Sequence, residues 1–394
     1  MSYLIGYRCT RCGLLHDPVV PQRTCRSCGG PLLAVYDIEA VRNRVVRDVF
    51  RRRGCTMWRY LELLPVSDER YVVSLGEGYT PLLRARRLGE SLGLRNLLVK
   101  DEGRNPTGSF KDRPISVTVS ALRELGVRSV AMPTSGNAGA SLAAYGVLAG
   151  LEVHVAMPKD TPRPIYAEVS VRGVDVVLVE GLISDAGRVV ADWASRYGWF
   201  DVSTMRVPYR AEGTKTMAYE VVEQLGWRAP DVVVFPTGGG EGVVGMWKGF
   251  RELLELGWVD RLPRMVVAQS EGCKPLVEAF RRGADRVEPY GGCSTVAVGI
   301  RVPKPFADTE ILRAVRESGG TAVAVGENEI LTSMREVASR EGIFACPEGA
   351  AAFAATRRLV EEGLVDRDET VVVFNTGSGL KYVDLVLQSN PARR

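Results

Sequence analysis

The stretch NPTGSFKDR at residues 105–113 lies between a predicted strand at 96–100 and a predicted helix at 111–125. A lysine in the first turn of a helix weakens that helix, because the positive end of the helix dipole lies there. The same field lowers the pKa of the amine and helps to keep it nucleophilic. Lys111 is therefore a candidate for imine chemistry with a carbonyl compound. An exposed lysine at an ordinary helix start is the alternative, and this stretch alone leaves both open.

Strand-like and helix-like segments alternate along the chain from about residue 97 onward. The strand-like segments are short continuous runs rich in valine, which is typical of parallel sheets covered by helices on both faces. A length of 394 residues favours more than one domain. The predicted fold class is therefore α/β, with two doubly wound domains, and ligands are expected at the loops that follow the strands. The predicted strands are 96–100, 127–132, 152–157, 175–179, 231–235, 264–269 and 370–374.

A second loop, PTSGNAGAS at residues 133–141, lies between a predicted strand and a helix predicted at 138–149. Hydroxyl groups, glycine and free backbone amides at a helix N-terminus form an anion site that suits a substrate carboxylate. The amide of Asn137 can donate a hydrogen bond to a cofactor oxygen. An ordinary capped helix start accounts for this segment equally well.

A third loop, PTGGGEG at residues 236–242, exposes several backbone amides to a phosphate, and the following helix adds its dipole. The overlapping stretch GEGVVG at 240–245 also fits the dinucleotide fingerprint, with Glu271 ending the next strand. A nicotinamide dehydrogenase is therefore an alternative, although it leaves Lys111 and Asn137 without a role. A fourth loop, NTGSGLK at 375–381, supplies a hydroxyl for a ring nitrogen or is a simple glycine-rich turn.

Four cysteines form two Cys-x2-Cys pairs near the N-terminus: Cys9, Cys12, Cys25 and Cys28. Four thiolates at this spacing fit a tetrahedral zinc ion, and a site closed by four cysteines is structural. Two disulfides are the alternative, which the lack of a secretion signal disfavours. Residues 1–35 are therefore predicted to form a zinc-ribbon-like module, with His16 as an unneeded extra ligand. The remaining cysteines are predicted to be buried apolar side chains: Cys55, Cys273, Cys293 and Cys346.

The composition argues against several classes of protein. A content of 45% hydrophobic and 25% charged residues is typical of a soluble globular protein. The net charge of +4 is spread along the chain, and the triplet Arg51 to Arg53 is predicted to be a solvated helix face, so nucleic-acid binding is not expected. No apolar run reaches eighteen residues, so no membrane span is expected. Only two histidines occur, which excludes a three-histidine metal site. The expected location is the cytoplasm.

The four loops occur in the order found in the fold-type II pyridoxal-phosphate enzymes, which include the tryptophan synthase β subunit. The chain resembles the threonine synthase family in particular. The matching motifs are SLGEGYTPL at 74–82, DEGRNPTGSFKDR at 101–113, PYRAEGTKT at 208–216 and TGSGLK at 376–381, and the resemblance covers essentially the whole chain. An N-terminal cysteine set like this one occurs in a subset of that family.

The resemblance implies a role for each motif. Lys111 would form the Schiff base with pyridoxal phosphate, Asn137 would bond the phenolic oxygen of the cofactor, and Thr376 would face its pyridine nitrogen. The cofactor phosphate would lie against Gly238, Gly239, Gly240, Glu241 and Gly242. The implied substrate-binding residues are Thr107, Thr134, Ser135, Gly136, Ser203 and Arg210. Among these, Ser135 and its neighbours would hold the carboxylate, and Arg210, with Ser203 or Thr204 nearby, would hold a substrate phosphate.

The predicted organisation is a module at 1–35, a large cofactor-binding domain at 36–95 and 202–394, and a small domain at 96–201 that carries Lys111. The resemblance implies a lyase that converts O-phospho-L-homoserine and water to L-threonine and phosphate, in a homodimer. Alternatives on the same scaffold are β-replacement on O-phosphoserine and deamination of threonine or serine. A zinc-ribbon interaction protein without catalytic activity is the alternative from another class.

Overall fold

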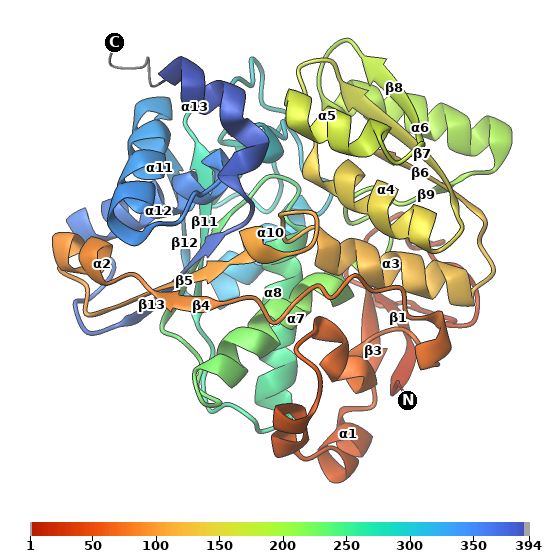
Figure 1. Ribbon diagram of the computed structural model, residues 1–394. Helices are drawn as coiled ribbons and strands as arrows, with labels where there is room; N and C mark the ends of the chain where they lie inside the picture. The colour runs from red at the N-terminus through yellow and green to blue at the C-terminus, as the bar shows by residue number, and fades with distance from the viewer. Residues whose placement is uncertain (1, 390–394) are drawn as a thin grey trace.

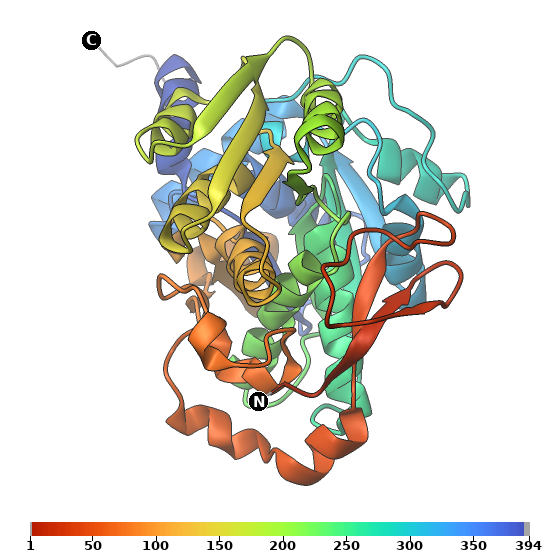
Figure 2. The same cartoon turned by 90° about the vertical axis from the view of Figure 1, so that its right-hand side faces the viewer.

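The N-terminal module in this computed structural model, which describes residues 2–389, is a three-stranded antiparallel sheet. Its strands, in spatial order, are β2 (Leu15–His16), β1 (Leu4–Cys9) and β3 (Leu32–Tyr36). Three short strands bury little apolar surface, so the module packs against helix α7 (Tyr209–Gln224). The rings of Tyr7 and Tyr209 meet edge to face with centroids 5.6 Å apart, and the Tyr36 hydroxyl donates to Glu212 over 3.0 Å. Figure 2 shows the module in red beside the green helices.

Six strands form the larger sheet, in which every neighbouring pair is parallel except the pair at one edge. Their spatial order is β12 (Thr321–Val325), β11 (Arg264–Ser270), β10 (Val232–Pro236), β13 (Thr370–Asn375), β5 (Asn96–Asp101) and β4 (Leu82–Arg84). Alternate valines of β13 enter different cores. Val371 and Val373 pack in the core that contains α12 (Pro347–Glu361), and Val372 packs in the core that contains α8 (Glu241–Glu255). Burial on both faces explains the continuous valine runs.

Four parallel strands form the smaller sheet, in the spatial order β8 (Asp175–Val179), β7 (Glu152–Pro158), β6 (Ser129–Pro133) and β9 (Phe200–Asp201). Helices α4 (Asn137–Leu148) and α5 (Arg163–Ser170) lie on one face, and α6 (Ile183–Tyr197) lies on the other (Figures 1 and 2). Helix α3 (Asp112–Glu124) packs against both α4 and α7 and so connects the two halves of the molecule.

The strand at 96–101 corrects one predicted boundary. We predicted that the small domain begins at residue 96, whereas β5 pairs with β13 and with β4 in the larger sheet. The apolar run at 97–99 carries no mark of the sheet that it joins, because a buried strand of either sheet has the same kind of side chains. The division of the chain into domains otherwise stays a prediction.

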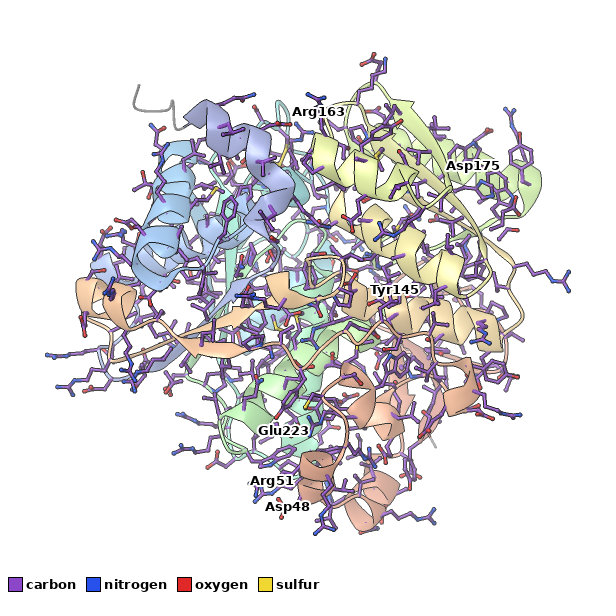
Figure 3. All side chains as sticks on the ribbon, viewed as in Figure 1. Asp48, Arg51, Tyr145, Arg163, Asp175 and Glu223 are labelled. Atoms are coloured by element: carbon purple, nitrogen blue, oxygen red, sulfur yellow. A yellow bond between two sulfur atoms is a disulfide. The ribbon has the colours of Figure 1, made fainter. Side chains whose placement is uncertain are left out.

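The other helices connect these layers. They are α1 (Ile38–Arg44), α2 (Arg86–Leu92), α9 (Pro275–Arg281), α10 (Asp308–Glu317), α11 (Glu327–Glu341) and α13 (Val383–Ser389), with 3₁₀ turns η1 (Arg47–Arg52), η2 (Met57–Leu63), η3 (Glu69–Tyr71), η4 (Glu102–Arg104), η5 (Val298–Ile300) and η6 (Gly379–Tyr382). Among residues 2–389, no helix is both long enough and apolar enough to cross a membrane. The basic triplet lies at the surface: the side chain of Arg51 is 69% exposed and points outward beside Asp48 (Figure 3).

The remaining four cysteines were predicted to be buried apolar side chains, which is wrong for Cys55 and for the partly exposed Cys293, whereas Cys273 is buried but bonded. Cys273 and Cys293 form a disulfide with their Cα atoms 4.7 Å apart, and Cys55 is exposed. Twenty residues separate the two bonded cysteines, and only the fold of the chain around α9 brings them together. Cys346 is buried as predicted.

Candidate active site

A cavity of about 930 Å³ lies where loops of the larger and the smaller sheet face each other. Its wall contains the segments that follow β6, β9, β10 and β13, as expected for ligand sites of parallel sheets. The fold therefore brings together the four loops that stood apart in the sequence. Most of the predicted site residues line the cavity: Lys111, Thr134, Ser135, Gly136, Asn137, Ser203, Gly238, Gly239, Gly240, Glu241, Gly242 and Thr376.

Lys111 lies directly before the first residue of α3. Gly108, with a φ of 71°, permits the tight turn that leads into it. The amine of Lys111 donates to the Glu241 carboxylate and lies 4.3 Å from the centroid of the Phe110 ring. Burial lowers the pKa of Lys111 and outweighs the opposing effect of Glu241. A buried amine with a lowered pKa on a cavity wall is suited to imine formation.

Arg210 does not line the cavity, contrary to our prediction that it holds a substrate phosphate. It is fully buried, and its Nε and Nη2 atoms donate to Glu241 over 2.6 and 3.0 Å. Burial alone raises the pKa of Glu241, but Arg210 and Lys111 outweigh it and lower that pKa to about 2. The motif around Arg210 could not reveal this ion pair, because its partner is 31 residues away. Arg210 is a buried counter-ion behind the cavity wall.

The triple-glycine loop forms a backbone cradle ahead of α8. A Cβ atom on Gly238 would lie 2.9 Å from the backbone of the facing loop, and one on Gly239 would lie 2.9 Å from a threonine methyl group. Gly240 has a φ of 83°, which side-chain-bearing residues rarely adopt. The exposed amides at this helix N-terminus fit a phosphate group. Glu241 can contribute only its backbone there, because its side chain is engaged behind the loop.

The loop before α4 offers a second cradle. The Thr134 hydroxyl accepts hydrogen bonds from the amides of Gly136 and Gly139 over 3.0 and 3.2 Å, so it shapes the loop. The Asn137 side chain reaches the cavity, and its buried Oδ1 atom has no partner among the described residues. Such an orphaned buried polar atom is the feature expected where a ligand binds. The loop thus fits a carboxylate at its amides and a polar cofactor atom at Asn137.

Among the cavity residues that sequence reasoning missed are Glu348 and Tyr382, which lie beside Asn137 and Thr376 on the wall. The Tyr382 hydroxyl donates to Glu348 over 3.0 Å and accepts from the Asn137 amide over 3.4 Å. Burial raises the pKa of Glu348, whose second carboxyl oxygen has no partner among the described residues. Thr376 lies nearby, with its hydroxyl 3.6 Å from the Cys346 sulfur. The only sequence feature that could have indicated a role for Tyr382 is its position directly after the fourth loop.

Thr107 is the other predicted residue that the structure keeps out of the cavity. Its backbone amide donates to Asp112 over 2.7 Å, and its hydroxyl lies 3.1 Å from that of Ser141. Because these partners hold the start of α3 against α4, Thr107 supports the position of Lys111.

Ser203 does line the cavity, and its amide donates to Asp201 over 2.9 Å.

The known proteins that this chain resembles use pyridoxal phosphate, which fits a cavity with a buried amine and a phosphate cradle. Residues 73–377 match the family described as pyridoxal-phosphate dependent enzyme. The threonine synthase of Methanocaldococcus jannaschii is 41% identical over 97% of this chain and 94% of its own length. The chain belongs to the threonine synthase family of pyridoxal-phosphate-dependent enzymes. The threonine synthase of Mycobacterium tuberculosis strain H37Rv, a more distant member, is 35% identical over 84% of this chain and 90% of its own length.

Solved structures show the same fold at low identity. Threonine deaminase isoform 2 of Solanum lycopersicum superposes with a TM-score of 0.69 at 21% identity, over 87% of this chain and 96% of its own. Maize serine racemase superposes with a TM-score of 0.67 at 20% identity, over 79% of this chain and 92% of its own. The predicted family, the α/β fold class and the predicted class of pyridoxal-phosphate-dependent lyase are confirmed. The nicotinamide dehydrogenase and the non-catalytic zinc-ribbon protein are not supported.

Proposed function

We propose that this protein converts O-phospho-L-homoserine and water to L-threonine and phosphate. The observation that carries the proposal is near full-length similarity to a protein named threonine synthase, at 41% identity. The cavity supports it chemically, since one wall joins a nucleophilic amine, a phosphate cradle and a second anion site at the start of α4. A cytoplasmic location and a homodimeric state remain predictions within the same proposal.

Each group of residues that lines the cavity would have its own role in catalysis or binding. Lys111 would hold the cofactor covalently and, once released, its Nζ atom would take up and return protons at the substrate carbons. The loop at 238–242 would hold the cofactor phosphate, and Asn137 would orient the ring. Thr376 would meet the ring nitrogen with a neutral hydroxyl. Bound pyridoxal phosphate supplies the electron sink that makes those carbons acidic. The backbone amides around Ser135 would hold the substrate carboxylate.

The substrate assignment is tested by comparing three reactions of the purified holoenzyme. O-phospho-L-homoserine should yield equal amounts of threonine and phosphate. O-phosphoserine with sulfide should give a kcat/KM about 10- to 200-fold lower, because the two substrates differ by one methylene group. Deamination of serine and threonine, followed by release of ammonia, should be slower still. A higher kcat/KM for cysteine formation from O-phosphoserine would assign the protein to β-replacement instead.

We also propose that the N-terminal module holds one structural zinc ion. The sulfur atoms of its four cysteines, Cys9, Cys12, Cys25 and Cys28, all lie within 4.8 Å of one another. Four thiols in a cluster of that size match the ligand set of a closed tetrahedral zinc site. His16 lies 3.4 Å from the Cys25 sulfur through its Nε2 atom and can donate to that thiolate.

Removal of this metal should unfold the module. Zinc binding to small cysteine sites contributes on the order of 10 kcal/mol, more than three short strands supply. Cys12→Ser should therefore lower the zinc content measured by atomic emission and allow proteolysis within the first 36 residues. Cys55→Ser is the matched control, because Cys55 is exposed and outside the cluster. Wild-type protein prepared without chelator that holds no zinc would contradict the proposal.

A further inference from the structure

The N-terminal module reaches the catalytic cavity. Arg23, in the loop between the two cysteine pairs, lines the cavity together with Asp201 and Ser203. The preceding residue fixes this loop, because the amide of Gln22 donates to the buried hydroxyl of Tyr209 over 2.8 Å. Figure 2 shows the red module beside the green helices, with one of its loops over the middle of the molecule. The cysteine module, which lies far from the catalytic loops in the sequence, therefore supplies a cation to the cavity.

The Arg23 guanidinium is only loosely held. Its Nη2 atom lies 3.8 Å from Asp201, and its side chain is 49% exposed. The ring of Phe200 lies 6.0 Å from the guanidinium carbon. Asp201 already accepts hydrogen bonds from the amide and the hydroxyl of Ser203. Both of those bonds go to Oδ1 of Asp201, whereas Arg23 lies near Oδ2. Because the ion pair with Oδ2 is long and Arg23 is half-exposed, Arg23 can turn towards an anion at little cost.

A second loosely held arginine lies in the next turn of the chain. The amide of Arg206 donates to the carbonyl of Ser203 over 3.0 Å, and its guanidinium lies 4.5 Å from the Phe306 ring. Within residues 2–389, no carboxylate lies within ion-pairing distance of Arg206 or of the neighbouring Lys304, and both line the cavity. The positive charges of Arg206 and Lys304 are therefore not neutralised by a carboxylate of the described residues.

The two cations nearest the phosphate cradle, Lys111 and Arg210, differ from Arg23 and Arg206 in that they share a buried carboxylate. Lys111 and Arg210 share the Glu241 carboxylate, so the protein itself neutralises part of their charge. An incoming dianion thus meets an uncompensated partner at Arg206 and a half-exposed one at Arg23, whose pair with Asp201 is long. Guanidinium groups suit a phosphate dianion, because their planar fork donates two parallel hydrogen bonds.

We propose that Arg23 of the cysteine module, together with Arg206, binds the phosphate group of the substrate. The module is then part of the substrate-binding site as well as a structural appendage. Cys25 lies two residues after Arg23, so a metal held by the cysteines would fix the loop that carries the guanidinium. This inference rests on the proposed function, since it assumes a phosphorylated substrate.

The test compares Arg23→Gln with Arg26→Gln in the holoenzyme. Arg26 is an exposed arginine of the same module that does not line the cavity, so it matches Arg23 in charge and location. Arg23→Gln should raise the KM for O-phospho-L-homoserine about tenfold, which corresponds to about 1.4 kcal/mol. The dissociation constant for inorganic phosphate, measured by calorimetry, should rise by a similar factor. Arg26→Gln should leave both values unchanged.

A ligand without phosphate, the proposed product L-threonine, distinguishes a loss of phosphate binding from general damage to the site. The affinity for L-threonine, followed by the absorbance of the bound cofactor, should be the same in wild type and Arg23→Gln. Equal phosphate affinity in Arg23→Gln and wild type would overturn the inference, even if wild type makes threonine. Weakening of L-threonine and of phosphate by the same factor would also overturn it, since Arg23 would then be structural. Failure of wild type to make threonine would instead refute the proposed function, and the calorimetric result would still report on Arg23.

Discussion

Lys111→Ala is expected to abolish turnover while the fold persists. Loss of a general acid–base group alone costs about 10²- to 10⁴-fold in rate, and this lysine would also hold the cofactor. The substitution removes one partner of Glu241, and Arg210 remains bonded to that carboxylate through two nitrogen atoms. The variant should therefore unfold at nearly the wild-type denaturant concentration and lack the yellow colour of covalently held pyridoxal phosphate.

The direct measurement is borohydride reduction of the holoenzyme followed by peptide mapping. The cofactor should be found on Lys111 in wild type and on no lysine in the variant. Lys159→Ala is a suitable control, because Lys159 is 55% exposed and pairs with Glu180 at the surface. A reduced cofactor attached to any other lysine of the wild-type protein would contradict the assignment.

Arg210→Met is expected to cost about 3–5 kcal/mol in the free energy of unfolding, because it leaves a buried carboxylate with one partner fewer. The side chains of Arg210 and Glu241 are 0% and 1% exposed, so water cannot replace the lost contacts. Chemical denaturation followed by circular dichroism measures the loss. Arg95→Met is the surface control, and its exposed pair with Asp368 should contribute less than about 1 kcal/mol.

The double variant Arg210→Met with Glu241→Gln shows whether the buried charge is the cause. Removal of the carboxylate charge should restore a large part of the lost stability, because the remaining side chains are neutral apart from Lys111. A double variant as unstable as the single one would assign the loss to packing around the arginine. The sequence resemblance implied that Arg210 binds the substrate phosphate, whereas in the structure Arg210 is the counter-ion of Glu241.

The four loops could be predicted from the sequence because each depends on neighbouring residues, and their resemblance to the motifs of the fold-type II enzymes supplied the cofactor class. The motif around Lys111 combines a turn, a helix start and an amine within nine positions, and the glycines at 238–240 mark a backbone cradle by their lack of a Cβ. The cysteine pairs likewise reveal their cluster by local spacing, and the structure brings all four sulfurs together. The strand β12 was missed, since its sequence TAVAV alternates valine with alanine and threonine and so lacks the continuous valine run of the predicted strands.

By itself, then, the sequence determined the family, the α/β class and the loops that surround the cavity, all through short-range patterns of side chains and backbone freedom. The tertiary structure alone decided which sheet contains β5, that Cys273 meets Cys293, that Glu241 holds Arg210 and that Arg23 reaches the cavity. The physical reason is that these contacts join segments 20 or more residues apart. Such contacts depend on how whole helices and sheets pack, and the chemistry of either partner alone does not specify the other.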